Sequence, residues 1–296
     1  MYLSHFGLDE APFGITPDTS FVFSCNAHQE ALNTLLVAIT NGEGFIKITG
    51  EVGTGKTLLC RRFLATLDER FVSAYIPNPY LEPKALMHAL ADELGVPVAS
   101  DLDQHQVLKR LNQALLEFAD AGKRVVVCLD EAQAMPLETL EALRLLSNLE
   151  TEKSKLLQVV LFGQSELDER LAQDSVRQLR QRITFEYTLG GLSRDELLLY
   201  LAHRLRVAGY SGKPLFDRRA VDALFAASNG LPRLVNIVAH KALLLVYGEG
   251  GHKVQARHVR AAVEDTPAAR QVAIGWWLLL AVLALVAAGV AWWWTR

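Results

Sequence analysis

The sequence has 296 residues, of which 50% are hydrophobic, and a formal net charge of −3. This length is sufficient for two domains followed by a short terminal segment. The slightly acidic balance gives no bulk electrostatic case for binding nucleic acid, because a domain with that function is usually basic. The cysteines Cys25, Cys60 and Cys128 have no metal-ligand spacing, so we expect them to be reduced and mostly packed.

The first two thirds of the chain predict alternating strands and helices. Residues 1–24 are rich in Phe, Pro and Asp and predict an ordered lead-in rather than a helix. Apolar strands that alternate with helices imply a parallel sheet covered on both faces, and hence an α/β fold. The predicted helices span 28–40, 56–67, 83–94, 104–121 and 137–150, and the predicted strands span 44–49, 71–76, 124–129 and 156–162.

The strand pattern ends at Gly190 and Gly191. Helical patterns follow at 195–207, 217–228, 232–247 and 256–264. The sequence therefore predicts an α/β domain over 25–190, a small all-helical lid domain over 191–265 and a linker over 266–272.

The run from Ala273 to Trp294 contains no charged and no polar side chain. As a helix it would extend roughly 33 Å, enough to cross a hydrocarbon core of ~30 Å. Tryptophans at both ends suit the headgroup regions. We expect a transmembrane helix over 273–294, with a buried helix docked on the domain as the alternative. Arg257, Arg260 and Arg270 precede the run, so the positive-inside rule predicts a single-pass protein with its N-terminal bulk in the cytoplasm.

The sequence GEVGTGKT at residues 50–57 matches the phosphate-loop pattern GxxxxGK[ST] between a predicted strand and a predicted helix. Backbone N–H groups of such a loop and the start of its helix bind phosphates. We expect Lys56 to reach the β- and γ-phosphates of ATP and Thr57 to place its hydroxyl on Mg²⁺. The expected nucleotide-binding residues of this segment are Gly50, Glu51, Val52, Gly53, Thr54, Gly55, Lys56, Thr57 and Leu58.

Two acidic residues follow the apolar strand at 124–129. Asp130 is expected to hold Mg²⁺ together with Thr57, and Glu131 to polarise the attacking water. Acids are also common in a turn after a buried strand, which is the structural alternative. The phosphate loop upstream argues against this alternative, and the adjacent acidic pair favours ATP hydrolysis over binding alone.

The phosphate loop, the DEAQ box at 130–133 and the two-domain layout resemble the AAA+ superfamily. The stretch YLSHFGLDEAPFGITPD at 2–18 and the segment LFGQSEL at 161–167 carry a narrower similarity to the ExeA/general secretion pathway protein A group, and most closely to its MSHA-type (type IV) pilus ATPases. The resemblance implies a homo-oligomeric ATPase of the bacterial inner membrane that works with pilus or secretion-system assembly proteins. ExeA-type proteins carry a peptidoglycan-binding module after their membrane span. Because this sequence stops at Arg296, we expect no direct binding to the cell wall.

The resemblance also implies roles for single residues. Gln164 corresponds to a polar residue beside the γ-phosphate, with an ordinary loop glutamine as the alternative. Arg182 is expected to reach the nucleotide of a neighbouring subunit, with Arg180 and then Arg177 as alternatives. Arg233, in the sequence GLPR that begins a helix, is expected to contact the γ-phosphate from the lid.

Three further positions and three further functions stay open at this point. The family likeness places Asn78 where a polar residue restrains the catalytic glutamate, and His28 and Glu30 near the adenine, although capping or surface roles suit both. The alternative functions are an ATPase of polysaccharide export, a DNA-associated AAA+ regulator of transposition or replication, and a nucleotide switch with negligible turnover. The net charge and the apolar run argue against the DNA-associated function.

Overall fold

The computed structural model describes residues 2–16, 19–146 and 155–269. The chain divides into two compact units. One unit consists of residues 26–190, and the other combines residues 1–25 with residues 191–296. We call them the α/β unit and the helical unit.

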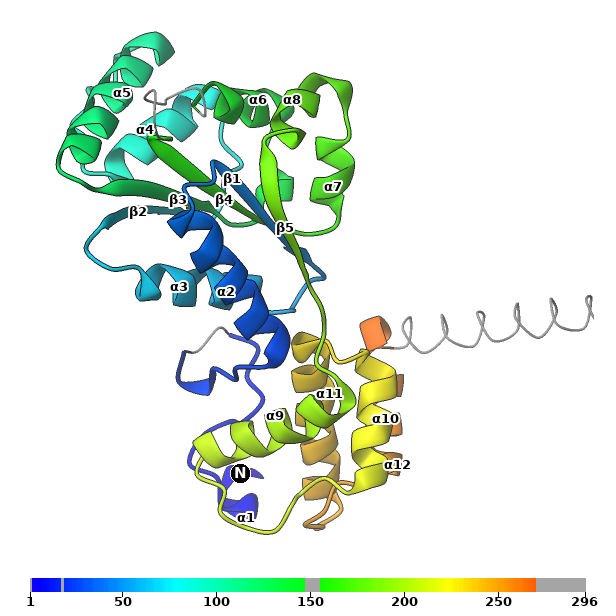
Figure 1. Ribbon diagram of the computed structural model, residues 1–296. Coiled ribbons are helices and arrows are strands. Elements are labelled where there is room, and N and C mark those ends of the chain that lie inside the picture. Colours follow the sequence, from blue (N-terminus) through cyan, green and yellow to red (C-terminus); the bar gives the residue numbers. More distant parts are fainter. Residues whose placement is uncertain (1, 17–18, 147–154, 270–296) are drawn as a thin grey trace, which may run out of the picture. The chain divides into compact units, whose positions relative to one another are not determined.

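The α/β unit is built on a parallel sheet of five strands in the order β2-β3-β4-β1-β5 (Figure 1). The α/β class predicted from the sequence is therefore confirmed. Parallel neighbours need crossover connections, and helices supply them here. The strands are β1 (Phe45–Gly50), β2 (Phe71–Ile76), β3 (Arg124–Leu129), β4 (Leu157–Gly163) and β5 (Ile183–Leu189).

The edge strand β5 is missing from the sequence-based prediction, which was wrong on this point. Its side chains alternate between half-buried and exposed positions until Leu189, so it lacks the continuous apolar run of the inner strands. Backbone pairing with β1 from Ile183 to Leu189 fixes it in the sheet.

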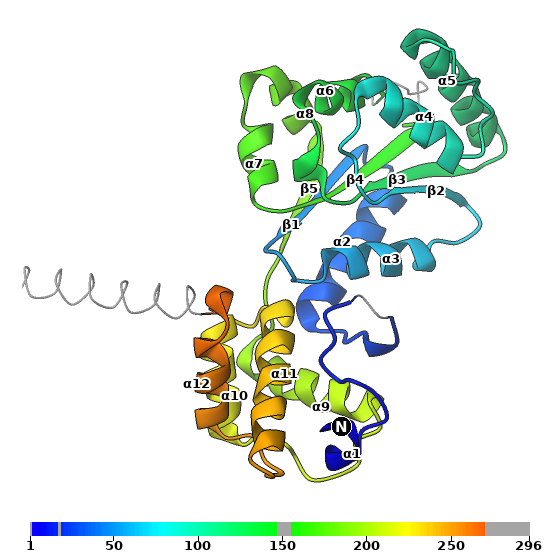
Figure 2. The same cartoon turned by 180° about the vertical axis from the view of Figure 1, so that it is seen from behind.

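Helices cover both faces of the sheet (Figures 1 and 2). Alternate residues of β3 show the division, because Val126 packs with α2 and α3 whereas Val125 and Val127 pack with α4, α5 and α6. The helices of this unit are α2 (Asn26–Thr40), α3 (Lys56–Thr66), α4 (Pro83–Glu93), α5 (Gln104–Asp120), α6 (Leu137–Leu146), α7 (Glu166–Leu171) and α8 (Arg177–Arg180).

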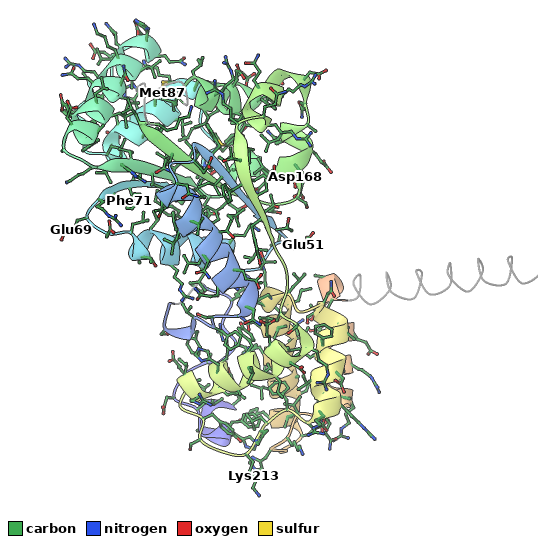
Figure 3. The ribbon with its side chains drawn as sticks, in the orientation of Figure 1. Glu51, Glu69, Phe71, Met87, Asp168 and Lys213 are labelled. Carbon is green, nitrogen blue, oxygen red and sulfur yellow. The ribbon has the colours of Figure 1, made fainter. Side chains whose placement is uncertain are left out.

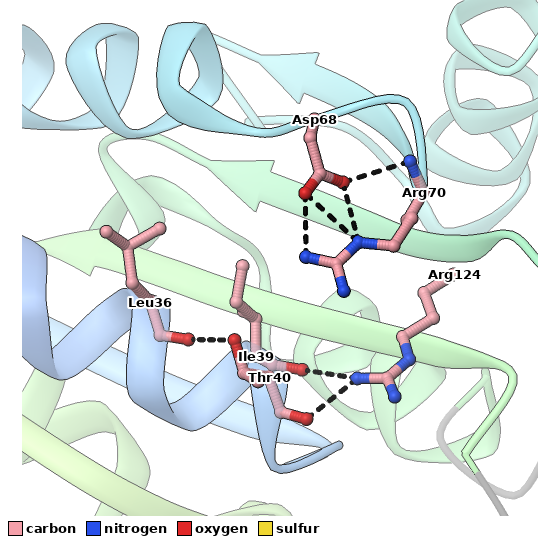
Figure 4. A network of polar contacts seen from close by, with 6 residues as sticks. All are labelled: Leu36, Ile39, Thr40, Asp68, Arg70 and Arg124. Carbon is pink, nitrogen blue, oxygen red and sulfur yellow. Dashed lines mark hydrogen bonds and ion pairs between the residues drawn. The ribbon is translucent and has the colours of Figure 1, made fainter.

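The C-terminal end of α2 is attached to the sheet by side chains from two strands. The guanidinium of Arg124 donates to the carbonyl oxygens of Ile39 and Thr40 at 3.2 and 2.8 Å (Figure 4). The amide of Gln158 donates to the Ile39 carbonyl at 3.1 Å. The last carbonyls of a helix have no partner within the helix, so these bonds satisfy them and fix the position of α2.

The helical unit contains α9 (Arg194–Val207), α10 (Arg218–Ser228), α11 (Pro232–Gly248) and α12 (Ala256–Glu264), and the N-terminal segment packs on them. Arg204 of α9 is buried and donates to the carbonyl oxygens of Pro12 and Gly14. The expectation of no helix in the lead-in was wrong, because the structure has α1 (Tyr2–Phe6) and a single turn η1 (Thr19–Phe21). Both are too short for periodicity to reveal, and tertiary packing stabilises them.

Within residues 2–16, 19–146 and 155–269, no helix is both long enough and apolar enough to cross a membrane. The transmembrane helix predicted at 273–294 lies outside the described residues, as does the end of the predicted linker. The side chains of Cys25, Cys60 and Cys128 are buried, in agreement with the expectation that they are packed.

Candidate nucleotide-binding site

The candidate site lies at one edge of the sheet, where the carboxyl ends of β1, β3 and β4 meet. β4 pairs with both β1 and β3 in parallel, so the three strands end side by side. The phosphate loop follows β1, Asp130 follows β3 and Gln164 follows β4. Ligands of open parallel sheets bind at this edge. The phosphate loop, Asp130 and Gln164 are thus brought together.

The phosphate loop depends on the two glycines that the motif requires, Gly50 and Gly55, and on a third at Gly53. Gly53 and Gly55 have φ values of 84° and 95°, a region that favours glycine. A Cβ atom at Gly50 would lie 2.6 Å from the carbonyl oxygen of Leu189 in β5. A Cβ atom at Gly55 would lie 2.7 Å from Nε2 of His28, so the His28 ring packs directly against the loop.

Lys56 lies inside the loop, with its side chain buried. Its ammonium donates to the carbonyl oxygens of Gly50 at 2.7 Å and Glu51 at 3.0 Å. Burial lowers the pKa of Lys56, while the nearby carboxylates of Glu131 and Asp130 act in the opposite direction. The ammonium is therefore held at the loop by weak carbonyl partners, which phosphate oxygens can replace with a stronger, charge-assisted bond.

The side chain of Thr57 meets the carboxylate of Asp130. The Thr57 hydroxyl donates to Asp130 Oδ2 at 2.6 Å, and the Tyr75 hydroxyl donates to the same oxygen at 3.3 Å. Burial, and then the charge of Asp130, raise the pKa of Tyr75 to about 12. A hydroxyl and a carboxylate are hard oxygen ligands of the kind that Mg²⁺ prefers, so the pair fits this ion.

Glu131 adopts a left-handed backbone conformation, with φ 53°, that is uncommon for a residue other than glycine. Its N–H donates to Asp130 Oδ1 at 3.0 Å. Its carboxylate accepts hydrogen bonds from the side-chain amides of Gln133 and Gln164, the latter at 3.1 Å. Strained backbone of this kind is typical of functional sites.

Gln133 is a site residue that the sequence analysis did not identify. It lies on the turn η2 (Ala132–Ala134), and its side-chain oxygen Oε1 accepts from the backbone N–H of Gln164 at 3.0 Å. It thus connects the ends of β3 and β4. A Cβ atom at Gly163 would lie 2.7 Å from Cδ2 of Leu167 and 3.3 Å from Oε1 of Gln133, so the glycine leaves room for both side chains. The signal in the sequence was the fourth letter of the DEAQ box.

The structure places the remaining candidates of the α/β unit outside this network. The carbonyl oxygen of the Asn78 side chain accepts from the Tyr80 N–H at 3.2 Å, within a local turn, whereas Gln133 and Gln164 provide the contacts to Glu131. The Glu30 carboxylate accepts from the Tyr187 hydroxyl at 3.0 Å. In the loop itself, Glu51 is exposed at the end of β1 (Figure 3). Val52 is exposed as well, and Leu58 is half-buried on α3.

The arginines lie elsewhere. Arg177 and Arg180 are exposed on α8, and Arg182 is half-buried directly before β5. Because Ile183 pairs with Phe45 at the start of β1, Arg182 is at the edge of the sheet opposite to the phosphate loop. Arg233 belongs to the helical unit, where it is exposed in the first turn of α11.

The phosphate loop, the acidic pair and the parallel sheet form a P-loop nucleotide-binding fold. Residues 39–171 match the family described as AAA domain. Solved structures share the fold. They include the ORC2 protein of Aeropyrum pernix in ADPNP–ADP complexes (TM-score 0.61, 19% identity, 86% of this chain and 71% of that chain) and Drosophila ORC bound to DNA (TM-score 0.62, 20% identity, 85% and 63%).

Along its length the chain is similar to General secretion pathway protein A of Aeromonas hydrophila. The two are 40% identical over an alignment of 296 positions, which covers 99% of this chain and 54% of the relative. The chain therefore spans about half the length of that protein. This similarity confirms the predicted resemblance to the general secretion pathway protein A group, while the narrower resemblance to MSHA-type pilus ATPases stays a prediction.

Proposed function

We propose that the chain hydrolyses ATP with Glu131 as the residue that polarises the attacking water. The observation that carries this proposal is the position of the Glu131 carboxylate, which two glutamine amides hold beside the Thr57–Asp130 pair. Lys56 and the loop N–H groups bind the phosphates. Thr57 and Asp130 would hold Mg²⁺, which neutralises charge on the phosphate oxygens when bound.

Within this network, Gln164 is the residue whose side chain would contact the γ-phosphate of bound ATP. Its amide donates to Glu131 and its backbone N–H is held by Gln133. A bound γ-phosphate offers the Gln164 amide a charged oxygen in place of the carboxylate. Transfer of this bond would release Glu131 toward water when ATP is present.

We infer that turnover needs a homo-oligomer. The phosphate loop follows Gly50, whose partner in β5 is Leu189, whereas Arg182 precedes Ile183 at the other end of the strand. At about 3.3 Å per residue, the strand separates Arg182 from its own loop by roughly 20 Å. Arg182 therefore suits the nucleotide of a neighbouring subunit, where a guanidinium stabilises the charge of the transferred phosphoryl group.

A mixture of two inactive variants tests this step. Lys56→Ala lacks a working phosphate loop but keeps Arg182. Arg182→Ala keeps a working phosphate loop but lacks the arginine. Mixed chains should recover part of the ATPase rate if the arginine acts between subunits. Mixing Lys56→Ala with Arg180→Ala and with Arg177→Ala identifies the residue. Mixtures that stay as inactive as their components would exclude action between subunits.

We propose that Arg233 makes a second contact with the γ-phosphate, in addition to the contact of Gln164. Pro232 occupies the first turn of α11, where its missing N–H has no cost, and directs Arg233 to the helix start. Such a contact would couple the helical unit to the nucleotide state. Arg233→Ala should lower kcat, with Arg206→Ala on α9 as the exposed control.

For the cellular role, we propose a single-pass ATPase of the bacterial inner membrane, with its N-terminal bulk in the cytoplasm and a transmembrane helix at 273–294 in contact with lipid. It would support assembly of a secretion apparatus or an MSHA-type (type IV) pilus together with the inner-membrane assembly proteins of that system. The similarity to General secretion pathway protein A and the apolar run support this role. Polysaccharide export is the competing role.

Deletion of the gene in its host, complemented with the wild-type chain or with Glu131→Gln, tests the cellular role. Loss of surface pili or of secreted proteins, rescued by the wild type alone, is the expected result. Loss of surface polysaccharide with normal pili and secretion would favour the competing role. The same variant, which should keep ATP bound, can be used to isolate the assembly partners.

A further inference from the structure

A groove with a volume of 890 Å³ lies between α10 and α12 of the helical unit. Phe216 and Val254, shortly before the two helices, form a parallel bridge, so α10 and α12 begin side by side. They run next to each other in the same direction (Figures 1 and 2). The walls of the groove are largely apolar and include Ala223, Ala226 and Val263.

The groove is lined by two arginines and two acidic residues, one of which is already paired. Arg219 on α10 and Arg260 on α12 are exposed, and neither has an ion-pair partner among the described residues. The carboxylate of Asp222 is already paired with Arg194 at 2.7 Å. Glu264 adds one further carboxylate at the C-terminal end of α12. The groove therefore offers two available guanidinium groups, which suit a phosphate group, against one available carboxylate.

The chain stays packed on the helical unit until close to the apolar run. The Thr266 hydroxyl donates to the Ala262 carbonyl at 2.8 Å, and Ala269 is fully buried. The apolar run begins at Ala273. Four residues of extended chain span at most about 14 Å. The C-terminal ends of α10 and α12 therefore cannot lie far from the start of the proposed transmembrane helix.

Apart from the carboxylate of Glu264, the order of residues along the groove matches the depth profile of a membrane surface. Ala226 and Val263 are near the C-terminal ends of their helices, closest to the apolar run. Arg260 is about one helical turn farther back, and Arg219 about two turns. Apolar side chains would thus contact acyl chains while the arginines lie at the level of the headgroups.

The geometry points to the α10–α12 groove as a binding site for an acidic phospholipid of the membrane that anchors the chain. The acyl part lies against the apolar walls, and the phosphate group binds Arg219 and Arg260. This inference rests on the proposed membrane anchor. It adds a second, headgroup-dependent contact that orients the helical unit on the bilayer.

Hydrogen exchange of the full chain in lipid nanodiscs tests the site. One set of discs contains phosphatidylcholine only, and the other contains phosphatidylcholine with phosphatidylglycerol. Exchange of α10 and α12 should slow in the presence of phosphatidylglycerol, while α5 in the α/β unit serves as the internal reference. In Arg219→Gln/Arg260→Gln this effect should disappear, because about 1 kcal/mol per arginine corresponds to roughly 30-fold weaker binding for the pair.

Lys109→Gln/Arg110→Gln on α5 is the matched control and should keep the lipid effect. Glu264→Gln should strengthen it, since one competing carboxylate is removed. Equal exchange in both lipids, or a phosphatidylglycerol effect that survives the double arginine variant, would overturn the inference. Protection that rises with protein concentration and not with phosphatidylglycerol would instead show a second copy in the groove, and would also overturn it. A chain that fails to enter nanodiscs would refute the proposed anchor, and the inference with it.

Discussion

The connection that Gln133 makes between Glu131 and Gln164 leads to a quantitative prediction. Gln133→Leu keeps the approximate side-chain volume but removes both hydrogen bonds. A hydrogen bond to a charged group contributes about 1.5 to 3 kcal/mol. If that contribution is expressed fully in the transition state, kcat falls by about 10- to 150-fold.

The affinity for ATP should change little, because the contacts of Lys56 and Thr57 do not involve Gln133. Stability should fall as well, since the Gln164 N–H loses its acceptor, at a cost of about 1 to 3 kcal/mol. Steady-state ATPase assays, nucleotide-binding titrations and urea unfolding measure the three quantities. Gln113→Leu, at an exposed position of α5, is the matched control.

A Gln133→Leu protein with the kcat of the wild type would show that the two amides do not position Glu131. A loss of ATP affinity as large as the loss of kcat would show that the substitution had disturbed the phosphate loop. In that case the role assigned to Gln133 would be wrong even though activity fell.

Three other predictions concern the loop, the acidic pair and the helical unit. Lys56→Ala should abolish ATP turnover, and a variant that hydrolysed ATP at the normal rate would refute the assignment of the site. The folded state raises the pKa of Tyr75 from 10.0 to about 12, so it favours the neutral phenol. That stabilisation is complete below pH 10 and is lost as the pH rises toward 12. The urea concentration at the unfolding midpoint should therefore fall more steeply between pH 10 and pH 12 for the wild type than for Tyr75→Phe. Gly230→Ala should lower the free energy of unfolding by about 2 to 4 kcal/mol, because Gly230 has φ 71° and a Cβ atom there would lie 2.0 Å from the Leu192 carbonyl oxygen. Gly190→Ala, where a Cβ atom meets open space, should be nearly neutral.

The elements with strong local signals could be predicted from the sequence. Long helices with clear apolar periodicity begin and end within two residues of the prediction, apart from α6, after which the described residues stop. The inner strands could be located because they are buried on both faces and therefore continuously apolar. β5 could not, since it is an edge strand whose alternating pattern is common in loops, and its pairing with β1 is a contact between distant parts of the chain.

The same distinction between local sequence signals and long-range contacts applies to the site. The phosphate loop and Asp130 are local motifs, and the strand ends bring them together as expected. The roles of Gln133 and Tyr75 depend on which strands are neighbours, and the order β2-β3-β4-β1-β5 cannot be deduced from local patterns. The role of Asn78 was predicted from the family likeness, whereas its side chain accepts a hydrogen bond from the nearby backbone N–H of Tyr80.

The packing of residues 1–25 on the helical unit has a consequence for synthesis on the ribosome. The α/β unit is inserted between two segments that fold together, so the first residues to emerge must wait for α9 and α11 before they reach their final contacts. At ~5–20 residues per second, this delay is on the order of 10 s or more, during which Phe6, Phe13 and Phe21 are without their native cover. We expect the nascent N-terminal segment to bind chaperones during this interval, and its deletion to leave a soluble α/β unit attached to an unstable helical unit.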